Sequence, residues 1–543
     1  MSEPLPGAPH SELVFAFVYP IGTSVEPVIE TFRNYLRQYG YESYQYRISD
    51  QLKSLRLKTS FVDQTPYGKR DALIKAGNEA RAIAQDDKIL AVMSVEDIAT
   101  RRRSDEKERP AAMPRTAHLV RSLKRPEEVS LLRAIYKSGF YLIGIANDDD
   151  AQEGYLINEL GIQPKLAKDL IERDQNEDLD HGQRTRDTFY LSDVFIQANE
   201  EQYKEQISRF LELVFGHPFI TPQRHEHSMF LAYASAARSA QLGRQVGAAI
   251  ATPEGEILAV GMNEVPSPKG GLYWDGDEED HRDHNKSIDP NAGQRELIAE
   301  SIIEKLTNEV VSAQKLREFV DNLLRKLKIE IPPLDLERLI QEELSENGVL
   351  IDGEKAMAAV KKSKLRSITE YGRAVHGEMD AILTCARLGI SVRGNYLYVT
   401  TFPCHNCTRH IIASGIRRVY YVEPYPKSKA RDLHSDAICF DEEEAKATGK
   451  IPFLPFIGVG PRRYLDFFSM DLSGGREVKR KEEDGKPCNP QKIERTPRVY
   501  LDPDSYLESE ERLRRDFDSV LRVLQPKQAP QQAENEGVGS RPS

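Results

Sequence analysis

The chain contains 543 residues, and its 75 Lys and Arg side chains stand against 86 Asp and Glu side chains, which gives a formal net charge of −11 at pH 7. Proteins that bind polynucleotides normally present a basic stripe that neutralises several phosphates, so we do not expect DNA or RNA as a substrate. Apolar runs stay below the ~18 residues that span a membrane, which excludes a membrane span. The five cysteines are scattered, which favours the reducing cytoplasm over a disulfide framework.

Residues 1–11 lack the features of a signal peptide, and we expect them to be flexible. Residues 12–218 alternate strand-like and helix-like segments. This alternation is typical of a parallel sheet with crossover helices. The segment VEPVIETFRNYLRQYG (25–40) is predicted to be a helix. Four segments are predicted to be strands: LVFAFVYP (13–20), ILAVMS (89–94), AHLVRSL (117–123) and GFYLIGIA (139–146).

The first strand-to-helix turn, YPIGTSVE (19–26), occupies the place of a phosphate-binding loop. Such a loop needs glycine, then lysine, then Ser or Thr, so that backbone N–H groups and an ammonium hold the phosphates. Only Gly22 matches here, because Ser24, Val25 and Glu26 fill the remaining positions. We therefore expect a degenerate loop with impaired ATP hydrolysis, in which Gly22 is the remaining candidate for a nucleotide contact.

AHLVRSLKRPEEVSLLRAIY (117–136) resembles the strand, Arg-x-Pro-Glu-Glu and helix of phage-type nucleotide kinases. The resemblance implies a kinase-like fold for residues 12–218. Arg121, Lys124 and Arg125 either bind a nucleotide without chemistry, form a protein contact, or are a basic helix start at the surface.

Residues 229–250 (MFLAYASAARSAQLGRQVGAAI) predict a long helix that runs into a short strand, and GMNEVP (261–266) follows. The acidic run DGDEEDHRDH (275–284) is either a solvated loop or a second metal site. Residues 287–364 combine helical, heptad-like spacing with dense alternating charge. This insert predicts surface helices that mediate an oligomer or a partner contact, or that cover an active site.

The motifs H-G-E (376–378) and P-C-H-N-C (403–407) form the H-x-E and P-C-x-x-C signature of zinc-dependent nucleobase deaminases. Helical spacing over 374–388, a strand over 396–401 and a helix opened by Pro403 place both motifs at helix starts. A zinc ion held by one imidazole and two thiolates keeps its fourth position for water, whose pKa falls to about 7. We assign His376, Cys404 and Cys407 as ligands, and Glu378 as the acid/base that moves the proton.

The alternative to a catalytic site is a purely structural zinc site. Such a site usually has four protein ligands and gives no reason for a glutamate two residues after the histidine. His405 and His410 are the candidates for a fourth ligand. We expect both to be ordinary helix residues, since His405 lies within the C-x-x-C turn and should point away.

Three short segments narrow the family: Ala-Arg-Ser (237–239), Val-Gly-Ala (246–248) and Gly-x-Asn (261–263). They resemble the deoxycytidylate deaminase branch of the cytidine deaminase superfamily. GMNEVPSPKGGLYW (261–274), YGRAVHGEMDAIL (371–383) and YYVEPYPKSKARDLHSDAI (420–438) further resemble the two-domain bacterial anti-phage dCTP deaminases, in which a kinase-like domain precedes the deaminase. The resemblance implies a cytosine ring in the pocket, Asn263 near the sugar hydroxyl, and residues 426–434 near the phosphates.

The phosphate assignment also has a physical basis. Four side chains that follow an apolar strand (419–422) in a turn-rich segment suit a compact anion such as a triphosphate: Lys427, Lys429, Arg431 and His434. The alternative is a solvated loop. Glu264 either binds the sugar or caps a turn.

Together these patterns predict an α/β protein: a phosphate-loop-kinase-like parallel-sheet domain at 12–218, a cytidine-deaminase-like α/β/α domain at 219–472 with the helical insert, an extension at 473–524 and a disordered tail at 525–543. We expect zinc-dependent conversion of deoxycytidine nucleotides, dCTP and also dCMP, to deoxyuridine nucleotides and ammonia. The resemblance implies depletion of dCTP during phage infection and an inhibitory regulator, RNA or protein, and we expect a homo-oligomer. The alternatives are a polynucleotide cytidine deaminase and a nucleotide-sensing or interaction protein with a structural zinc.

Overall fold

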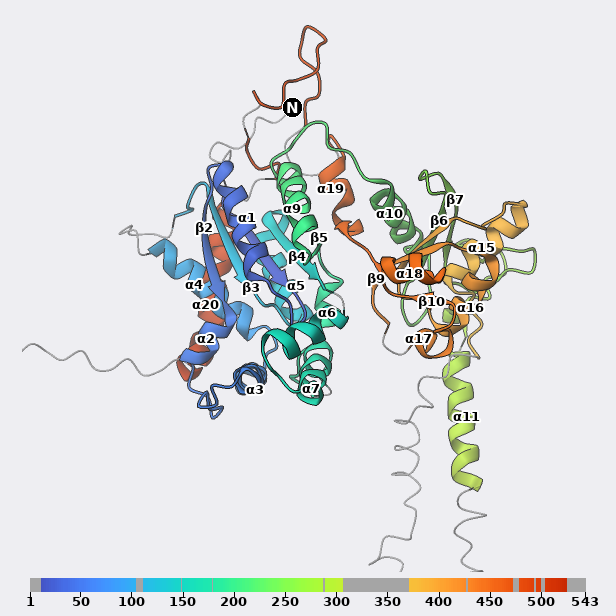
Figure 1. The fold of residues 1–543 in the computed structure, drawn as a ribbon, viewed down its shortest axis with the longest axis horizontal. Helices are drawn as coiled ribbons and strands as arrows, with labels where there is room; N and C mark the ends of the chain where they lie inside the picture. Colours follow the sequence, from blue (N-terminus) through green and yellow to red (C-terminus); the bar gives the residue numbers. More distant parts are fainter. Residues whose placement is uncertain are drawn as a thin grey trace, which may run out of the picture.

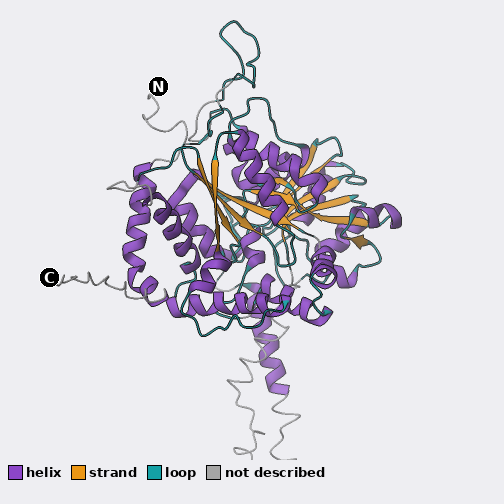
Figure 2. Ribbon diagram, turned by 60° about the vertical axis from the view of Figure 1, so that its left-hand side comes forward, coloured by secondary structure: helices purple, strands orange, loops and turns teal. Residues whose placement is uncertain are grey.

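The computed structural model describes residues 11–103, 111–147, 149–177, 179–286, 289–305, 371–425, 428–471, 478–492, 495–499 and 503–524. Within this part, the chain folds as predicted into a mixed α/β protein with two six-stranded sheets, both dominated by parallel strand pairs. Helices lie on both sides of the strands (Figures 1 and 2). The expected flexible start, most of the insert and the expected tail lie outside the described residues.

The first sheet has the strand order β12-β5-β4-β1-β3-β2. Alternate residues of its strands belong to two separate apolar clusters, with Val14 and Ala16 on one face of β1 and Phe15 and Phe17 on the other. Both faces are buried because crossover helices cover a parallel sheet on both sides. The first five strands are β1 (Leu13–Val18), β2 (Glu42–Arg47), β3 (Thr116–Arg121), β4 (Phe140–Ala146) and β5 (Val194–Gln197).

Three of the four predicted strands are confirmed as β1, β3 and β4, but ILAVMS (89–94) was wrongly predicted as a strand and begins helix α4. Every residue from Ile89 to Val95 is buried, and α4 packs against the neighbouring helices α3 and α5 and against the distant helix α20 (Pro503–Leu524). A helix buried all round has no amphipathic period. The helices of this part are α1 (Glu26–Gln38), α2 (Ile48–Ser54), α3 (Pro66–Ala84), α4 (Ile89–Arg103), α5 (Pro126–Tyr136), α6 (Asp149–Gly154), α7 (Pro164–Gln175), α8 (Thr185–Phe189) and α9 (Glu200–Val214).

The second sheet has the order β10-β11-β9-β8-β6-β7, with α15 and α16 packed on one face and α10 on the other. The strand predicted at 396–401 is confirmed as β8, and the helix predicted at 374–388 is confirmed as α15. The strands are β6 (Gly247–Ala251), β7 (Ile257–Met262), β8 (Tyr396–Thr401), β9 (Arg418–Glu423), β10 (Ile438–Cys439) and β11 (Ile451–Pro455). The helices are α10 (Arg224–Ala236), α15 (Gly377–Leu388), α16 (His405–Ser414), α17 (Ala430–Leu433) and α18 (Glu442–Thr448).

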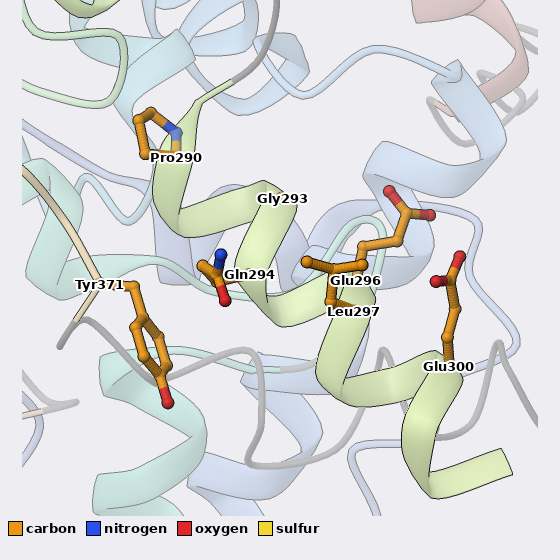
Figure 3. Close-up of a pocket in the computed structure, with 7 residues that line it drawn as sticks. All are labelled: Pro290, Gly293, Gln294, Glu296, Leu297, Glu300 and Tyr371. Atoms are coloured by element: carbon orange, nitrogen blue, oxygen red, sulfur yellow. The ribbon is translucent and has the colours of Figure 1, made fainter. Parts of the chain in front are cut away.

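Helix α11 (Pro290–Lys305) is the described part of the predicted insert, and it projects from the second sheet (Figures 1 and 2). One side of α11 and Tyr371 line a hollow of ≈ 670 Å³ (Figure 3). The remaining insert helices predicted up to 364 lie outside the described residues. Among the helices that the structure describes, none combines the length and the apolar character required to cross a membrane.

After β11 the chain returns to the first sheet. There it forms β12 (Gly458–Val459), which pairs antiparallel with β5, then α19 (Tyr464–Phe468) and α20 (Pro503–Leu524). Residues 456–471 and 503–524 therefore pack with the first sheet, although we expected the deaminase domain to run to 472 and an extension to follow. The physical reason is that β12 covers the edge of β5, which would otherwise expose unpaired backbone groups.

A buried charged cluster anchors α20. The guanidinium of Arg102 lies 2.8 Å from a Glu12 oxygen and also pairs with Glu510 of α20. The hydroxyl of Tyr136 donates to Glu510 at 2.6 Å. Because removing one partner would leave a buried charge unpaired, at a cost of about 3–5 kcal/mol, these contacts fix the position of α20 on the first sheet.

Candidate zinc active site

The two sequence motifs lie at two adjacent helix starts. Helix α15 begins directly after His376, and α16 begins directly after Cys404, whose sulfur accepts the backbone N–H of Cys407 at 3.5 Å. Strand β7 approaches the start of α15 so closely that a Cβ on Gly261 would lie 2.3 Å from the backbone oxygen of Gly377. Glycine is therefore required where the second sheet supports the first motif.

The imidazole and the two thiols form a compact donor set. His376 Nδ1 lies 3.3 Å from Cys407 Sγ and 3.4 Å from Cys404 Sγ, and the two sulfurs are 3.6 Å apart. Zn–S bonds of about 2.3 Å and Zn–N bonds of about 2.0 Å in a tetrahedral site place ligand atoms roughly 3.5–3.8 Å from one another. The spacing of these three atoms therefore fits zinc, and three protein ligands leave one position open.

Among the described residues, no other group of three or more His, Cys, Asp or Glu side chains brings ligand atoms this close together. The group includes neither His405 nor His410, and His410 Nδ1 instead lies 2.7 Å from the backbone oxygen of Asn406. The acidic run at 275–284 forms ion pairs, since Asp280 lies 2.7 Å from Arg282. This pairing favours the loop alternative over a second metal site.

The electrostatics of the site suit metal binding and proton transfer. The pKa of Cys404 is lowered to about 4, first by its hydrogen bond with Cys407 and then by His376, so its sulfur readily becomes a thiolate. Glu378, in the first turn of α15, is only 3% exposed. Burial, and then the negative charge of Cys404, raise the pKa of Glu378 above its ordinary value. A carboxylate in such a place can hold a proton closer to neutral pH.

Asn263 and Glu264 bind the backbone of the loop that precedes β6. Asn263 donates from Nδ2 to the oxygen of Arg244 at 2.8 Å and accepts from the N–H of Val246 at 2.7 Å. The Glu264 carboxylate is 1% exposed and accepts from the N–H of Ala240 at 2.8 Å. Of the two alternatives for Glu264, this structure shows the one in which it holds a turn.

The predicted phosphate loop reaches the metal site through a residue that the sequence did not single out. Ser428 Oγ donates to the backbone oxygen of Pro403 at 2.8 Å, directly before Cys404. Lys427 lies outside the described residues. Lys429 is exposed and pairs with Asp432 at 2.9 Å, the guanidinium of Arg431 lies 4.0 Å from the ring of Phe440, and His434 is half-buried.

Sequence reasoning also missed Arg244 and Tyr425. Arg244 lies in the loop that Asn263 fixes, is half-exposed, pairs with Glu423 at 2.9 Å, and lies 5.7 Å from the Tyr425 ring. The pKa of Tyr425 is raised, first by burial and then by the charge of Cys404, so the phenol lies within electrostatic range of the metal site. A lone arginine in a predicted loop carries no periodic signal that could have singled it out.

Comparison with known proteins agrees with this geometry. Residues 340–423 match the family model described as the cytidine and deoxycytidylate deaminase zinc-binding region. The chain carries a deoxycytidylate deaminase-like zinc domain. The matched family and the His/Cys/Cys group confirm Zn²⁺ as the predicted metal of this domain.

Two curated relatives match a short part of this chain. ComE operon protein 2 of Bacillus subtilis is 47% identical over 53 residues, which cover 10% of this chain and 28% of that protein. The deoxycytidylate deaminase of Enterobacteria phage T4 is 46% identical over 55 residues, which again cover 10% of this chain and 28% of that protein. The chain thus matches less than a third of the length of these relatives.

Two solved structures are similar at lower identity. The dCMP deaminase from cyanophage S-TIM5 in apo form is 15% identical, with a TM-score of 0.20, and the match covers 44% of this chain and 100% of that chain. The same enzyme in complex with dCMP and dUMP is 17% identical, with a TM-score of 0.21, and the match covers 43% of this chain and 98% of that chain.

Proposed function

We propose that this protein is a zinc-dependent hydrolase that converts deoxycytidine nucleotides, dCTP and also dCMP, to deoxyuridine nucleotides and ammonia. The observation that carries the proposal is the donor set of His376, Cys404 and Cys407 with the buried carboxylate of Glu378 beside it. These three donors hold the zinc ion. When bound, zinc supplies a Lewis acid that lowers the pKa of water enough for attack at neutral pH.

Glu378 moves the protons of the reaction. Its carboxylate takes one proton from the attacking water and delivers it to the ring nitrogen. It then takes the remaining proton of the added hydroxyl and passes it to the amino group, which leaves as ammonia while the carbonyl forms. The raised pKa of Glu378 supports this role, because a group that both accepts and returns a proton works best when its pKa lies near the working pH.

Nucleotide recognition is proposed for both sides of the site. Arg244 contacts the first phosphate, because its guanidinium lies in a loop bonded to Asn263 and faces Tyr425 near Cys404. Asn263 lies near the sugar. The outer phosphates of dCTP are proposed to contact the segment that Ser428 joins to the metal site, through Lys427, Lys429, Arg431 and His434.

We further propose that the turn at Gly22 does not hydrolyse ATP. Asp174, which is 2% exposed, accepts from the N–H of Ile21 at 2.9 Å and from Lys124 Nζ at 2.7 Å. The chain's own carboxylate therefore occupies backbone and ammonium donors beside the turn. A Cβ on Gly22 would lie 2.7 Å from the oxygen of Gln152, so the turn is also closely packed.

The other two cations of this region have protein partners as well. Arg121 pairs with Glu26 at 2.8 Å, and Arg125 pairs with Asp87 at 2.6 Å. These pairs favour the protein-contact alternative over a bound nucleotide. A kinase-like ancestry of the first sheet remains a proposal that rests on the resemblance of residues 117–136.

The cellular role is proposed from the resemblance of the deaminase segments. It comprises depletion of dCTP during phage infection, restraint by an inhibitory RNA or protein, homo-oligomeric assembly and a cytoplasmic location. Restraint fits an enzyme whose reaction consumes a DNA precursor, because unrestrained activity would harm the host.

The test is to incubate the purified protein separately with CMP, CTP, dCMP and dCTP and to resolve the products by chromatography. We expect ammonia with dUTP and dUMP from the two deoxynucleotides. Absence of turnover on all four, in protein that contains zinc, would contradict the proposal. A polynucleotide deaminase would instead bind single-stranded DNA or RNA tightly and with strong salt dependence in a mobility-shift assay.

A further inference from the structure

A pocket of ≈ 390 Å³ lies where the two sheets meet, and we call it the interdomain pocket. Its walls come from β5 and α9 of the first part of the chain, from the start of α10, from β9, and from residues 457–459, which return to the first sheet. The volume lies within the range of about 300–1,000 Å³ that is typical of small-molecule sites, and such sites favour domain junctions. By contrast, the described residues that line the hollow beside α11 come from that one helix and Tyr371 (Figure 3).

The lining of the interdomain pocket is rich in apolar and aromatic side chains. Phe195, Phe210 and Val459 line it and are each 1% exposed. Tyr420 and His225 line it as well. Burial lowers the pKa of His225, so its imidazole is neutral at pH 7 and adds a second uncharged ring. Flat apolar walls of this kind suit a flat ligand.

The rim of the pocket is a polar stripe on α9. Gln202, Glu205, Gln206 and Arg209 recur at helical spacing and all line the pocket. Gln206 accepts from the N–H of Gln197 at 2.9 Å, so its side chain already has a partner. The side chains of Gln202 and Glu205 are exposed, and neither forms a hydrogen bond or ion pair with another described residue.

The charge of the rim indicates what the pocket can accept. Among the described lining residues, Arg209 is the single Lys or Arg, and its guanidinium is already held by both oxygens of Glu226, at 2.8 and 2.7 Å. The uncommitted charge is the carboxylate of Glu205, which repels phosphate. A carboxylate only accepts hydrogen bonds, so a ligand there must donate them, while the amide of Gln202 can both donate and accept.

We propose that the interdomain pocket binds an uncharged nucleobase or nucleoside that carries an exocyclic amino group. The ring packs against the apolar lining beside Tyr420 and His225. Its amino group donates a hydrogen bond to Glu205, and the adjacent acceptor atom of the ring accepts one from the amide N–H of Gln202. A phosphorylated form is disfavoured, because the pocket has no free cation to meet it. This proposal is independent of the chemistry proposed for the zinc site.

Such a ligand would bridge the two halves of the molecule. Glu226, which is fully buried at the start of α10, also accepts from the N–H of Val459 at 2.8 Å. The pair formed by Arg209 and Glu226 therefore joins α9, α10 and the returning strand directly beside the pocket. Binding there stabilises this junction, so unfolding of the whole chain shifts to higher temperature as the free ligand concentration rises above its dissociation constant.

The test is calorimetric titration of the full chain with adenosine, guanosine, thymidine and GMP. We expect adenosine or guanosine to bind at least ten-fold more tightly than thymidine, which lacks an amino group, and guanosine to bind at least ten-fold more tightly than GMP. Cytidine is left out because it can enter the zinc site. Failure of both purine nucleosides to bind, or equal affinity for GMP and guanosine, overturns the proposal.

Two variants on the exposed rim locate the binding site. Gln202→Trp fills the entrance and should abolish binding, whereas Glu205→Gln should weaken it at least ten-fold. Lys204→Trp places the same bulk on α9 outside the pocket and should leave affinity unchanged. Thermal unfolding of each free variant verifies folding. Wild-type affinity in folded Gln202→Trp overturns the assignment, and no readout depends on deamination.

Discussion

Replacing Glu378 by glutamine keeps the size of the side chain and removes the carboxylate assigned to proton transfer. General acid–base catalysis contributes about 10²–10⁴-fold to rate, which corresponds to roughly 3–5 kcal/mol. The structure favours the upper end, since Glu378 is 3% exposed and bulk water does not readily replace it. The next acid on α15, Asp380, accepts instead from the N–H of Met262 on β7 at 3.3 Å. We therefore expect a loss of about 10⁴-fold in kcat.

The assay measures ammonia release from dCMP and dCTP, together with the zinc content of the same preparation. Glu378→Gln should retain zinc, because the donor set contains His376, Cys404 and Cys407 alone. Asp380→Asn is the matched control, and its rate should stay within ten-fold of the wild type. A Glu378→Gln protein that contains zinc and turns over within ten-fold of the wild type would refute the acid/base assignment.

Three further predictions follow from the same structure. Arg244→Gln should raise KM for dCMP at least ten-fold and leave KM for deoxycytidine unchanged. Lys429→Gln, the control, should change KM for dCMP little. Equal effects of Arg244→Gln on the nucleoside and the nucleotide would contradict the phosphate role. Chelation should abolish ammonia release and expose both motif thiols to a thiol reagent, and added Zn²⁺ should restore the rate. Burial alone would raise the pKa of Glu12, but hydrogen bonding with His118 and the charge of Arg102 lower it from 4.5 to about 2. The stabilisation by Glu12 is therefore present above pH 4.5 and lost toward pH 2. In denaturant unfolding, the free energy of unfolding of the wild type should exceed that of Glu12→Gln by about 3 kcal/mol at pH 6, and this difference should disappear near pH 2. A difference that does not depend on pH would exclude this linkage.

Local patterns predicted the His/Cys/Cys donor set that the structure brings together, because its parts are close in sequence. Each motif lies within a few residues of the chain. Apolar spacing and a proline predict the helix starts around the motifs, and a run with β-branched residues predicts the strand between them. The zinc assignment depends on residue types that few other sites combine. Local patterns could not predict that Arg244 lies near the metal site. Its loop is bonded to Asn263, its guanidinium lies near the Tyr425 ring, and Tyr425 is in turn within electrostatic range of Cys404.

Elements whose environment is set by distant residues were predicted least well. The segment 89–94 has the composition of a buried strand, but it begins a helix that packs against α20, more than 400 residues later in the chain. Similarly, Glu510 and Arg102 are 408 positions apart, and no spacing rule connects them. Asn263 illustrates a related case: its residue type suggested a sugar contact, and no local pattern indicated that its amide also holds the backbone of the adjacent loop.

The return of the chain through β12 and α20 changes how the two halves can be separated or moved. The second sheet is in effect an inserted domain, attached to a discontinuous first domain by two crossings instead of one. Two attachments restrict rotation much more than a single linker does, so a displacement at β5 would be transmitted to β9 and α10 as strain instead of being absorbed by a hinge. A fragment that ends near residue 218 would also leave the apolar residues of α4 without their cover, so dissection of this protein should excise the inserted domain and retain the C-terminal helix.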